Sequence, residues 1–349
     1  MKRLPFLQFI FLLFLSITST AIAASKTERF YFNGDKIFSS HSVYTVVDII
    51  GEGAFGQVYL VKNENNILYA LKCYKPISQG LLLYSDALRE FEKGQLLDHP
   101  HIVKTVDYFD FHTYKGENTQ NLILEYLEGQ TLYLTKKNWL SKKEGLKGLF
   151  HFCEALSYAL SKNLMHLDLH AGNVMVTSTA DIVVIDLASF FSFEELLHYV
   201  HSSITSSSSY TSQIINRQLS QTSTFHLKEK DFKAPNHSKL KTFFHHHPKL
   251  FQELKQLVLA SFLSSPNFSI DEQSKQQSKI ANYKQSIENH YFNKLTDLCM
   301  AILDKAELDR EERLQMKMKM KSLSWNYQED LLEEIAQPLP FYLDQLNTF

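Results

Sequence analysis

Two carboxylates and one amide near the middle of the chain have the types and the spacing needed to handle a metal ion beside phosphate. Asp168 and Asn173 lie in the polar segment His166–Asn173, and Asp186 directly follows the apolar run Ile182–Ile185. Carboxylate and amide oxygens are hard ligands, and Mg²⁺ is usually held by one or two carboxylates together with phosphate oxygens. The plain alternative is that these residues only form turns, which Asp and Asn often do.

A glycine-rich segment nearer the N-terminus could hold the phosphates themselves. Residues 51–58 (GEGAFGQV) fit the pattern G-x-G-x-x-G-x-V. Glycine has no Cβ, so its backbone can approach phosphate oxygens closely. The same glycine spacing opens dinucleotide-binding folds, but there it lies between a strand and a helix. Here it lies between two apolar runs that read as strands, which argues against a dinucleotide-binding fold. The remaining alternative to a phosphate-binding loop is a simple glycine-rich hairpin.

Lys72 stands in an otherwise apolar segment, Tyr69-Ala70-Leu71-Lys72. A buried charge without a partner is costly, so a lysine in such a strand needs an anion nearby. An ion pair with a glutamate on a neighbouring helix would supply that anion. Taken alone, however, Lys72 could equally face solvent from an edge strand.

With two further segments, these motifs resemble the eukaryotic-type protein kinase family over roughly residues 44–190. Residues 87–104 (ALREFEKGQLLDHPHIVK) are similar to the family's C helix and the strand after it, and residues 121–129 (NLILEYLEG) are similar to its hinge. The spacing to the His-Pro pair puts Glu90 at the position of the lysine's partner, with Glu92 as the nearby competitor. Six matches stand in the family's order, each in the expected strand, loop or helix.

The resemblance implies ATP as the phosphoryl donor, Mg²⁺ as the cofactor and a role for each motif residue. Lys72 and Glu90 would pair and position the phosphates, and Asp168 would orient the acceptor hydroxyl and take its proton. Asn173 and Asp186 would hold the metal. The nucleotide-binding positions that it implies are Gly51, Gly53, Gly56, Val58, Ala70, Lys72, Glu125, Leu127 and Met175.

Four positions depart from the family's pattern. Leu167 replaces an arginine that often binds a phosphorylated activation loop in the family, and Ala188 replaces the DFG glycine. His170 replaces the usual catalytic-loop lysine, as in small-molecule kinases of the aminoglycoside phosphotransferase type. Gly94 lies inside the C helix, where glycine costs about 1 kcal/mol relative to alanine, so we expect a loosely held helix. A small-molecule kinase and a nucleotide-binding pseudokinase serving as a binding module are therefore alternatives to a Ser/Thr protein kinase.

Hydrophobic patterning gives the elements that must position these residues. Strands are predicted over 44–50, 58–61, 67–74, 102–111 and 121–127, and helices over 84–97 and 144–162. The pattern from 239 to 346 is mostly helical. The predicted fold class is α+β: a two-lobed protein-kinase-like fold with an N-terminal antiparallel β lobe carrying the C helix, and a mainly α-helical C-terminal lobe. The lobes span residues 44–124 and 125–346, and residues 201–238 form a Ser/Thr-rich flexible segment.

The N-terminus has the pattern of a signal peptide over residues 1–23. Lys2 and Arg3 precede the apolar run Leu4–Ile17, and Ala21-Ile22-Ala23 is a small-residue cleavage pattern. Residues 24–43 would then be an N-terminal extension of the mature chain. We expect an exported protein, secreted or periplasmic. Such a protein would meet ATP either after delivery into another cell or in a secretory lumen supplied with ATP, and the sequence does not choose between the two. Membrane contact is expected only if the N-terminal segment stays uncleaved.

Composition restricts the partners. The chain has 36 Lys and Arg against 38 Asp and Glu, a net charge of −2, without the basic excess typical of nucleic-acid-binding domains. We therefore expect no nucleic acid as a partner, while the resemblance to protein kinases implies ATP and a protein substrate. Cys73, Cys153 and Cys299 are far apart and odd in number, which predicts buried free thiols rather than a disulfide framework.

Overall fold

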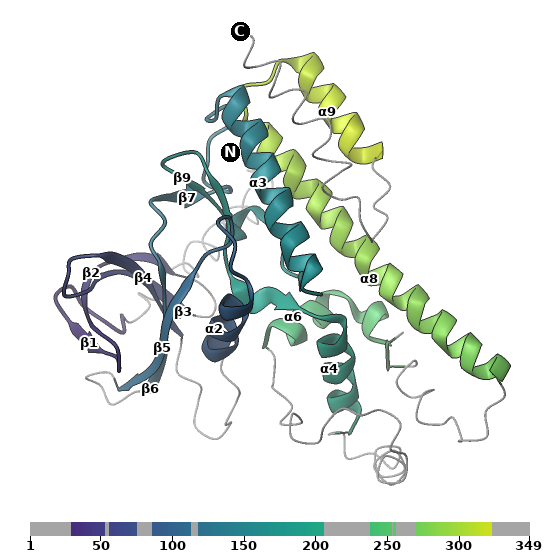
Figure 1. Ribbon diagram of the computed structural model, residues 1–349, viewed down its shortest axis with the longest axis horizontal. Coiled ribbons are helices and arrows are strands. Elements are labelled where there is room, and N and C mark those ends of the chain that lie inside the picture. The colour runs from purple at the N-terminus through teal and green to yellow at the C-terminus, as the bar shows by residue number, and fades with distance from the viewer. Residues whose placement is uncertain are drawn as a thin grey trace, which may run out of the picture.

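The structure is a computed structural model, and it arranges the chain as a strand-rich lobe beside a helical lobe (Figure 1). The parts of the chain that it describes are residues 29–52, 56–74, 86–112, 118–205, 238–252, 254–255 and 270–322. The predicted signal peptide, Gly53 and residues 206–237 of the Ser/Thr-rich segment lie outside these ranges.

A six-stranded antiparallel sheet forms the first lobe, in the order β1-β2-β3-β4-β6-β5. Its strands are β1 (Lys36–Phe38), β2 (Val43–Glu52), β3 (Gly56–Lys62), β4 (Leu68–Tyr74), β5 (Thr105–His112) and β6 (Asn118–Glu125). Apolar side chains at alternate positions, among them Tyr59, Val61 and Leu71, are buried in the core of this lobe. The strand order puts β4, and with it Lys72, between β3 and β6 near the middle of the sheet.

Two sequence predictions for this lobe need correction. The strand predicted from residue 102 begins at Thr105, because residues 102–103 pair with the second lobe instead: Val103 N–H donates to the Val184 carbonyl at 3.0 Å. Strand β1 was not predicted, and it pairs with β2 through Ile37 opposite Tyr44. Three strands, β2 to β4, lie where the apolar runs predicted them.

Helix α2 (Asp86–Leu96) is the predicted C helix, and it packs on β5 and β6. A Cβ at Gly94 would lie 2.2 Å from Thr105 Oγ1, so only glycine lets the helix approach β5 this closely. The Thr105 hydroxyl also accepts a hydrogen bond from Gln95 Nε2 at 3.1 Å. Gly94 therefore serves close packing, and the expectation that it loosens the helix is wrong for this structure.

The second lobe is built around two long helices that run side by side in Figure 1, α3 (Lys142–Ser161) and α8 (Ile270–Lys305). A capping box starts α3, with the Glu144 N–H donating to Ser141 Oγ and the Ser141 N–H donating to Glu144. The two helices approach closely: the Sγ atoms of Cys153 and Cys299 lie 3.9 Å apart, and a Cβ at Gly145 would lie 2.2 Å from the Cβ of Ala306, just beyond α8. All three cysteines are buried and free, as predicted.

Short elements of the second lobe carry the residues predicted for the catalytic loop and the metal-binding segment. They are β7 (Gly129–Thr131), β8 (Met165–His166), η1 (Ala171–Asn173), β9 (Val174–Thr177), β10 (Ile182–Val184), η2 (Leu187–Ser189) and β11 (Phe190–Phe191). β9 pairs with both β7 and β10, and β8 pairs with β11. Helices α4 (Phe193–Thr205), α6 (Ser238–His246) and α9 (Arg310–Ser322) complete the described part of the lobe. The predicted α+β, two-lobed fold class is thus confirmed.

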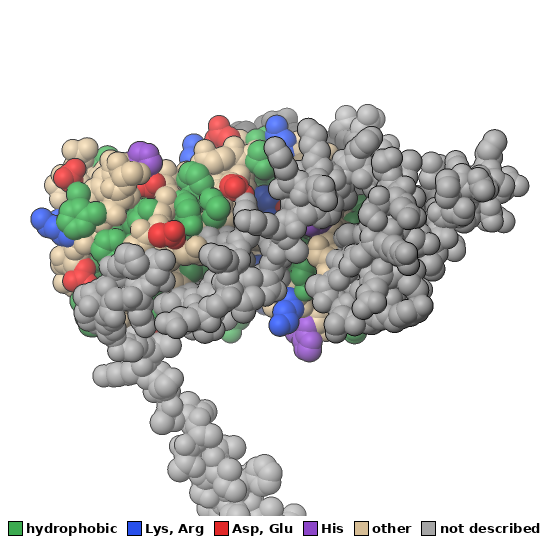
Figure 2. Space-filling view, turned by 90° about the horizontal axis from the view of Figure 1, so that it is seen from below, with side chains coloured by type: hydrophobic (Ala, Val, Ile, Leu, Met, Phe, Trp, Pro, Cys, Tyr) green, Lys and Arg blue, Asp and Glu red, His purple; other side chains and the backbone are tan. Residues whose placement is uncertain are grey.

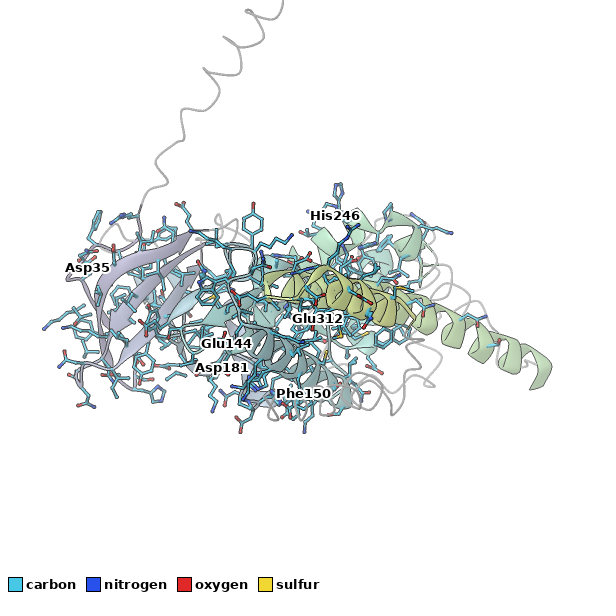
Figure 3. The ribbon with its side chains drawn as sticks, turned by 90° about the horizontal axis from the view of Figure 1, so that it is seen from above. Asp35, Glu144, Phe150, Asp181, His246 and Glu312 are labelled. Atoms are coloured by element: carbon cyan, nitrogen blue, oxygen red, sulfur yellow. The ribbon has the colours of Figure 1, made fainter. Side chains whose placement is uncertain are left out.

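Charged residues occur in both lobes of the molecule (Figure 3). Asp35 lies in the strand lobe, far from Glu312 and His246 in the helical lobe (Figure 3). On the face shown in Figure 2, acidic, basic and hydrophobic side chains of the described residues are interspersed over the strand lobe. None of the helices in the described ranges combines the length and the apolar character of a membrane span.

Replacing Gly94 by alanine tests the close packing of α2. Helix propensity alone would stabilise the variant by about 1 kcal/mol. Overpacking against Thr105 costs about 1–3 kcal/mol, so we expect Gly94→Ala to lower the free energy of unfolding, measured by urea titration. Adding Thr105→Ala removes the two nearest clashing atoms, Oγ1 and Cγ2, but keeps the Thr105 Cβ at 2.8 Å, so it should recover only part of the loss. A Gly94→Ala variant more stable than the parent would contradict the packing account.

Candidate active site

Lys72 stands at the centre of a buried charge cluster between the lobes. Its Nζ donates to Glu90 Oε2 at 2.6 Å and to Asp186 Oδ1 at 3.0 Å. Glu90 projects from α2 with a fully buried side chain, and Asp186 comes from the turn after β10. The ion pair predicted from the apolar strand is present, with Asp186 as a third member.

The two anions keep Lys72 charged. Burial alone would lower the pKa of the Lys72 ammonium, but Glu90, Tyr74 and Asp186 together raise it well above its ordinary value. The phenol of Tyr74 donates to the same Glu90 Oε2, and the Lys72 ammonium lies 5.1 Å from the centroid of the Tyr74 ring. Sequence reasoning missed Tyr74, whose phenol lies two residues along the strand and faces the same side as Lys72.

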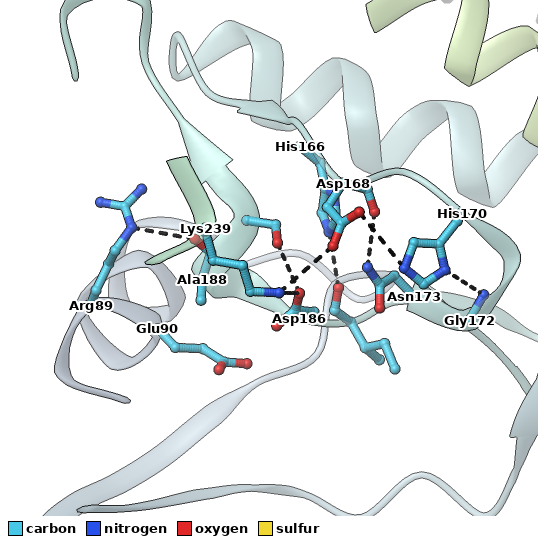
Figure 4. A network of polar contacts seen from close by, with 12 residues as sticks. Arg89, Glu90, His166, Asp168, His170, Gly172, Asn173, Asp186, Ala188 and Lys239 are labelled. Carbon is cyan, nitrogen blue, oxygen red and sulfur yellow. Dashed lines mark hydrogen bonds and ion pairs between the residues drawn. The ribbon is translucent and has the colours of Figure 1, made fainter. Parts of the chain in front are cut away.

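Asp186 adopts the left-handed backbone conformation, with φ 64° and ψ 62°, at the start of η2. Asp tolerates this region better than most residues, but the conformation needs support from its surroundings. Ser189 Oγ donates to Asp186 Oδ2 at 2.8 Å, and Lys239 Nζ donates to the same oxygen at 2.6 Å (Figure 4). Burial alone would raise the pKa of Asp186, but Lys72 and Lys239 hold it well below its ordinary value.

Asp168 and Asn173 lie on one loop that closes on itself. Asn173 Nδ2 donates to the Asp168 carbonyl at 2.9 Å, and the Ile185 N–H donates to the Asn173 carbonyl at 3.0 Å. The Asp168 side chain is 52% exposed, in contrast to the buried Glu90 and Asp186. Asp168 is therefore the carboxylate of the cluster that an incoming acceptor could reach.

Lys239 is a second member of the cluster, after Tyr74, that the sequence did not reveal. It projects from the first turn of α6, and its Nζ lies 2.6 Å from Asp186 Oδ2 and 3.7 Å from Asp168 Oδ2 (Figure 4). It is 53 residues beyond Asp186 in the chain. Beyond an amphipathic pattern from residue 239, no local signal marks it, because only the folding of the second lobe brings α6 to this place.

The positions predicted to contact nucleotide fall into two groups. Val58 and Lys72 are cross-strand partners in β3 and β4, and Ala70 lies two residues before Lys72 on the same face. Gly51 pairs with Val58 across β2 and β3. At Gly56 a Cβ would lie 2.1 Å from the Cys73 carbonyl oxygen, so this glycine is required by the strand pairing itself.

The second group joins the two lobes. The Glu125 N–H at the end of β6 donates to the Lys104 carbonyl at 3.0 Å. Leu127 and Met175 are half-buried and pack against the main core, as does Ala70. The structure thus brings the described predicted residues to one region, while Gly53 lies outside the described ranges.

Arg89 fastens α2 to the segment after Asp186. Its side chain is 5% exposed and donates to Glu195 Oε1 at 2.6 Å, to the Ala188 carbonyl at 3.3 Å and to the Phe190 carbonyl. The guanidinium carbon lies 3.9 Å from the centroid of the Phe191 ring. Because Arg89 adjoins Glu90, this anchor holds the helix that supplies the partner of Lys72.

The oxygen atoms around Asp186 suit a hard divalent cation. The carboxylate is held ionised, and the Asn173 amide uses its nitrogen on the Asp168 carbonyl, so its oxygen is the atom that could face a metal. The Lys239 ammonium already lies on Asp186 as a cation of the protein's own. This donor set fits Mg²⁺, which takes carboxylate and amide oxygens together with phosphate.

Comparison with known proteins gives the family of the chain. The protein kinase domain family matches residues 44–227, more than half of the 349 residues. The chain belongs to the protein kinase family. The match begins within β2 and includes Lys72, Glu90, Asp168, Asn173 and Asp186.

Several curated relatives are Ser/Thr protein kinases by name. The chain is 32% identical over 148 residues to the probable serine/threonine-protein kinase MARK-C of Dictyostelium discoideum, covering 41% of this chain and 19% of the relative. It is 30% identical to human serine/threonine-protein kinase 10, over 46% of this chain and 16% of the relative. It is 29% identical to mouse serine/threonine-protein kinase tousled-like 1, over 41% of this chain and 20% of the relative. The matched segment spans a fifth or less of these three relatives.

The Glu195 anchor predicts a pH-dependent contribution to stability. Burial alone would raise the pKa of Glu195, but Arg89 and Lys93 lower it to about 2 from an ordinary value of 4.5. The unfolded chain therefore takes up this proton at a higher pH than the folded protein. The contribution is complete above about pH 4.5 and is lost as the pH falls toward about 2.

We expect Glu195→Gln to destabilise the protein by on the order of 1–3 kcal/mol at pH 7, measured by urea unfolding. The difference between the variant and the parent should shrink at about pH 3. Glu194→Gln, at the exposed neighbouring position of α4, is the matched control and should change little. A difference that stays constant down to pH 3 would contradict the ion-pair account.

Proposed function

We propose that this chain is an ATP- and Mg²⁺-dependent protein kinase that transfers the γ-phosphoryl group to a serine or threonine hydroxyl. The observation that carries the proposal is Lys72 bound to both Glu90 and Asp186. In this family the lysine–glutamate pair and the metal-binding aspartate must both be in place before transfer. Here one lysine contacts both residues, which supports the proposal.

The nucleotide would lie between the lobes against residues that share a face. Val58, Ala70 and Met175 offer half-buried apolar side chains to the adenine ring. Because the Glu125 N–H is bound to the Lys104 carbonyl, we expect Glu125 to contribute its carbonyl and Leu127 to contribute backbone groups. Lys72 would neutralise phosphate charge while Glu90 keeps its ammonium in position.

Asp168 would serve as the proton acceptor. An acceptor hydroxyl that reaches this half-exposed carboxylate attacks the γ-phosphorus, and its proton passes to Asp168. The new bond joins the acceptor oxygen to phosphorus, and the bond from phosphorus to the β–γ bridging oxygen breaks. That oxygen keeps the electron pair and leaves as part of ADP, so charge and atoms balance.

Asp186 and Asn173 are the residues that would hold Mg²⁺, which when bound supplies positive charge to the phosphate oxygens. The chain's own contribution is the orientation of these oxygens. Asp186 is fixed by Lys72, Lys239 and Ser189, and Asn173 is fixed through its nitrogen. Catalysis of phosphoryl transfer by a protein consists mostly of such positioning together with electrostatic stabilisation.

A Ser/Thr protein acceptor is favoured by the relatives, which carry that activity in their names. His170 at the lysine position and the divergent helical lobe leave a small-molecule acceptor as the second candidate. A pseudokinase would bind nucleotide and transfer nothing. All three are separated by the assay below.

We further propose that the kinase needs no phosphate on its activation segment. Leu167 cannot bind such a phosphate, since it lacks the arginine charge. Arg89, Lys93 and Glu195 instead tie α2 to residues 188–195 through ion pairs and carbonyl contacts. The helix is thus held in the paired position by the unmodified chain.

Replacing Asp168 tests the proposal directly. The assay measures transfer of labelled γ-phosphate to a mixture of generic proteins and, separately, to small hydroxyl compounds. We expect Asp168→Ala to reduce transfer to protein by roughly a hundredfold or more while ATP affinity changes little, because Asp168 acts on the acceptor. The control is Asp98→Ala, whose carboxylate is 87% exposed and ion-pairs only at 4.0 Å with Lys104.

Three outcomes would go against the proposal in different ways. Undiminished transfer by Asp168→Ala would remove Asp168 from the mechanism. Transfer confined to small hydroxyl compounds would establish the second candidate. Nucleotide binding by the parent without any transfer would establish a pseudokinase.

We also propose that the chain is exported through residues 1–23. Support comes from the sequence pattern alone: two basic residues, an apolar run and a small-residue cleavage pattern. Fusing residues 1–28 to a reporter should place the reporter outside the cytoplasm, with a new N-terminus near Ala24. A reporter retained in the cytoplasm with its N-terminal segment intact would contradict export.

A further inference from the structure

Lys239 places a second ammonium beside the carboxylates that the proposed transfer uses. Its side chain is 11% exposed and lies 2.6 Å from Asp186 Oδ2 and 3.7 Å from Asp168 Oδ2. The family's usual catalytic-loop lysine is missing, because its position is His170. We propose that Lys239 is a further catalytic residue, whose ammonium binds the γ-phosphoryl group in place of that lysine; this inference rests on the proposed kinase function.

His170 is not built to provide the missing charge. Its Nδ1 accepts a hydrogen bond from the Gly172 N–H at 3.0 Å and caps η1 (Figure 4). This bond occupies Nδ1 and leaves Nε2 as the other ring nitrogen, 3.8 Å from Asp168 Oδ1. A ring used as a cap is a poorer partner for phosphate than the ammonium of a lysine on a flexible stem.

The placement of Lys239 runs against the preference of a helix. It lies in the first turn of α6, where the helix dipole disfavours a cation. The next residue, Leu240, is fully buried, and the Phe244 ring stacks on Tyr199 with centroids 5.5 Å apart. A helix anchored in the core therefore holds a cation at its unfavourable end, and the two carboxylates it meets offset that cost.

The position also suits the chemistry. Asp186 belongs to the metal-binding side of the site and Asp168 to the acceptor side, so a group between them adjoins the phosphoryl group in transit. Lysine has a flexible four-carbon stem, and its ammonium can move from Asp186 to a terminal phosphate oxygen when nucleotide arrives. There it would stabilise the charge on the equatorial oxygens without giving up a proton.

The test compares Lys239→Ala with Lys241→Ala, an exposed position on the same helix with the same change of charge. Calorimetry measures the dissociation constants of Mg²⁺-ATP and Mg²⁺-ADP for each protein. We expect Lys239→Ala to weaken ATP binding roughly ten- to a hundredfold and to leave ADP binding nearly unchanged, because only ATP carries the γ-phosphate. Lys241→Ala should match the parent for both nucleotides.

A rescue variant separates a charge contact from a structural role. Transfer of phosphate by the Lys239→Ala variant should fall roughly a hundredfold or more. Adding His170→Lys to this variant returns a lysine to the catalytic loop, and the double variant should recover much of the transfer and of the ATP affinity. Equal losses for ATP and ADP without rescue would mean that Lys239 only holds α6 in place. Tighter ATP binding or faster transfer by Lys239→Ala would mean that Lys239 blocks the site. Either result overturns the proposal.

The two proposals can fail separately in these experiments. If the parent transfers no phosphate but Lys239→Ala still loses ATP selectively, the γ-phosphate contact stands and the kinase function falls. If the parent transfers phosphate and Lys239→Ala behaves like Lys241→Ala, the kinase function stands and the assignment of Lys239 falls. Binding of neither nucleotide by the parent would overturn both.

Discussion

A lysine ammonium removed from water must be surrounded by anions, and the arrangement of both lobes follows from how Lys72 meets this need. One anion, Glu90, arrives on α2 and the other, Asp186, arrives on the turn after β10. The pairing therefore ties the sheet, the helix and the catalytic segment to a common point. Breaking it would leave Glu90, which is fully buried, as an unpaired charge, and such a loss is far more costly than an exposed ion pair.

The rest of the site extends this balance of charge. Asp186 has a second cation in Lys239, and α2 has a second attachment in Arg89, whose partner Glu195 also binds Lys93. The buried or partly buried carboxylates Glu90, Asp186 and Glu195 therefore each form an ion pair with a lysine or arginine from another element. The arrangement is ready for anionic phosphates because cations already converge on it, and this is the electrostatic preorganisation that phosphoryl transfer requires.

The sequence predicted what local patterns encode and missed what the tertiary fold creates. The strands, the C helix and the Lys72–Glu90 pair follow from apolar periodicity and from motif spacing within one lobe. Lys239 could not be predicted in the same way, since its partners lie in another part of the chain. At Gly94 a local signal was present but misleading. The low helix propensity of glycine predicted a loosely held helix, but the close contact with Thr105 makes glycine the residue that fits. Packing overrides propensity where two elements approach closely.

The central claim is that this charge cluster binds the phosphates of ATP. A crystal structure of the chain with a non-hydrolysable ATP analogue and Mg²⁺ tests it most directly. The account predicts metal density on Asp186 and Asn173, with the Lys72–Glu90 pair intact and the Lys239 ammonium on the terminal phosphate. A nucleotide bound elsewhere, or phosphates that avoid Lys72 and Asp186, would contradict it.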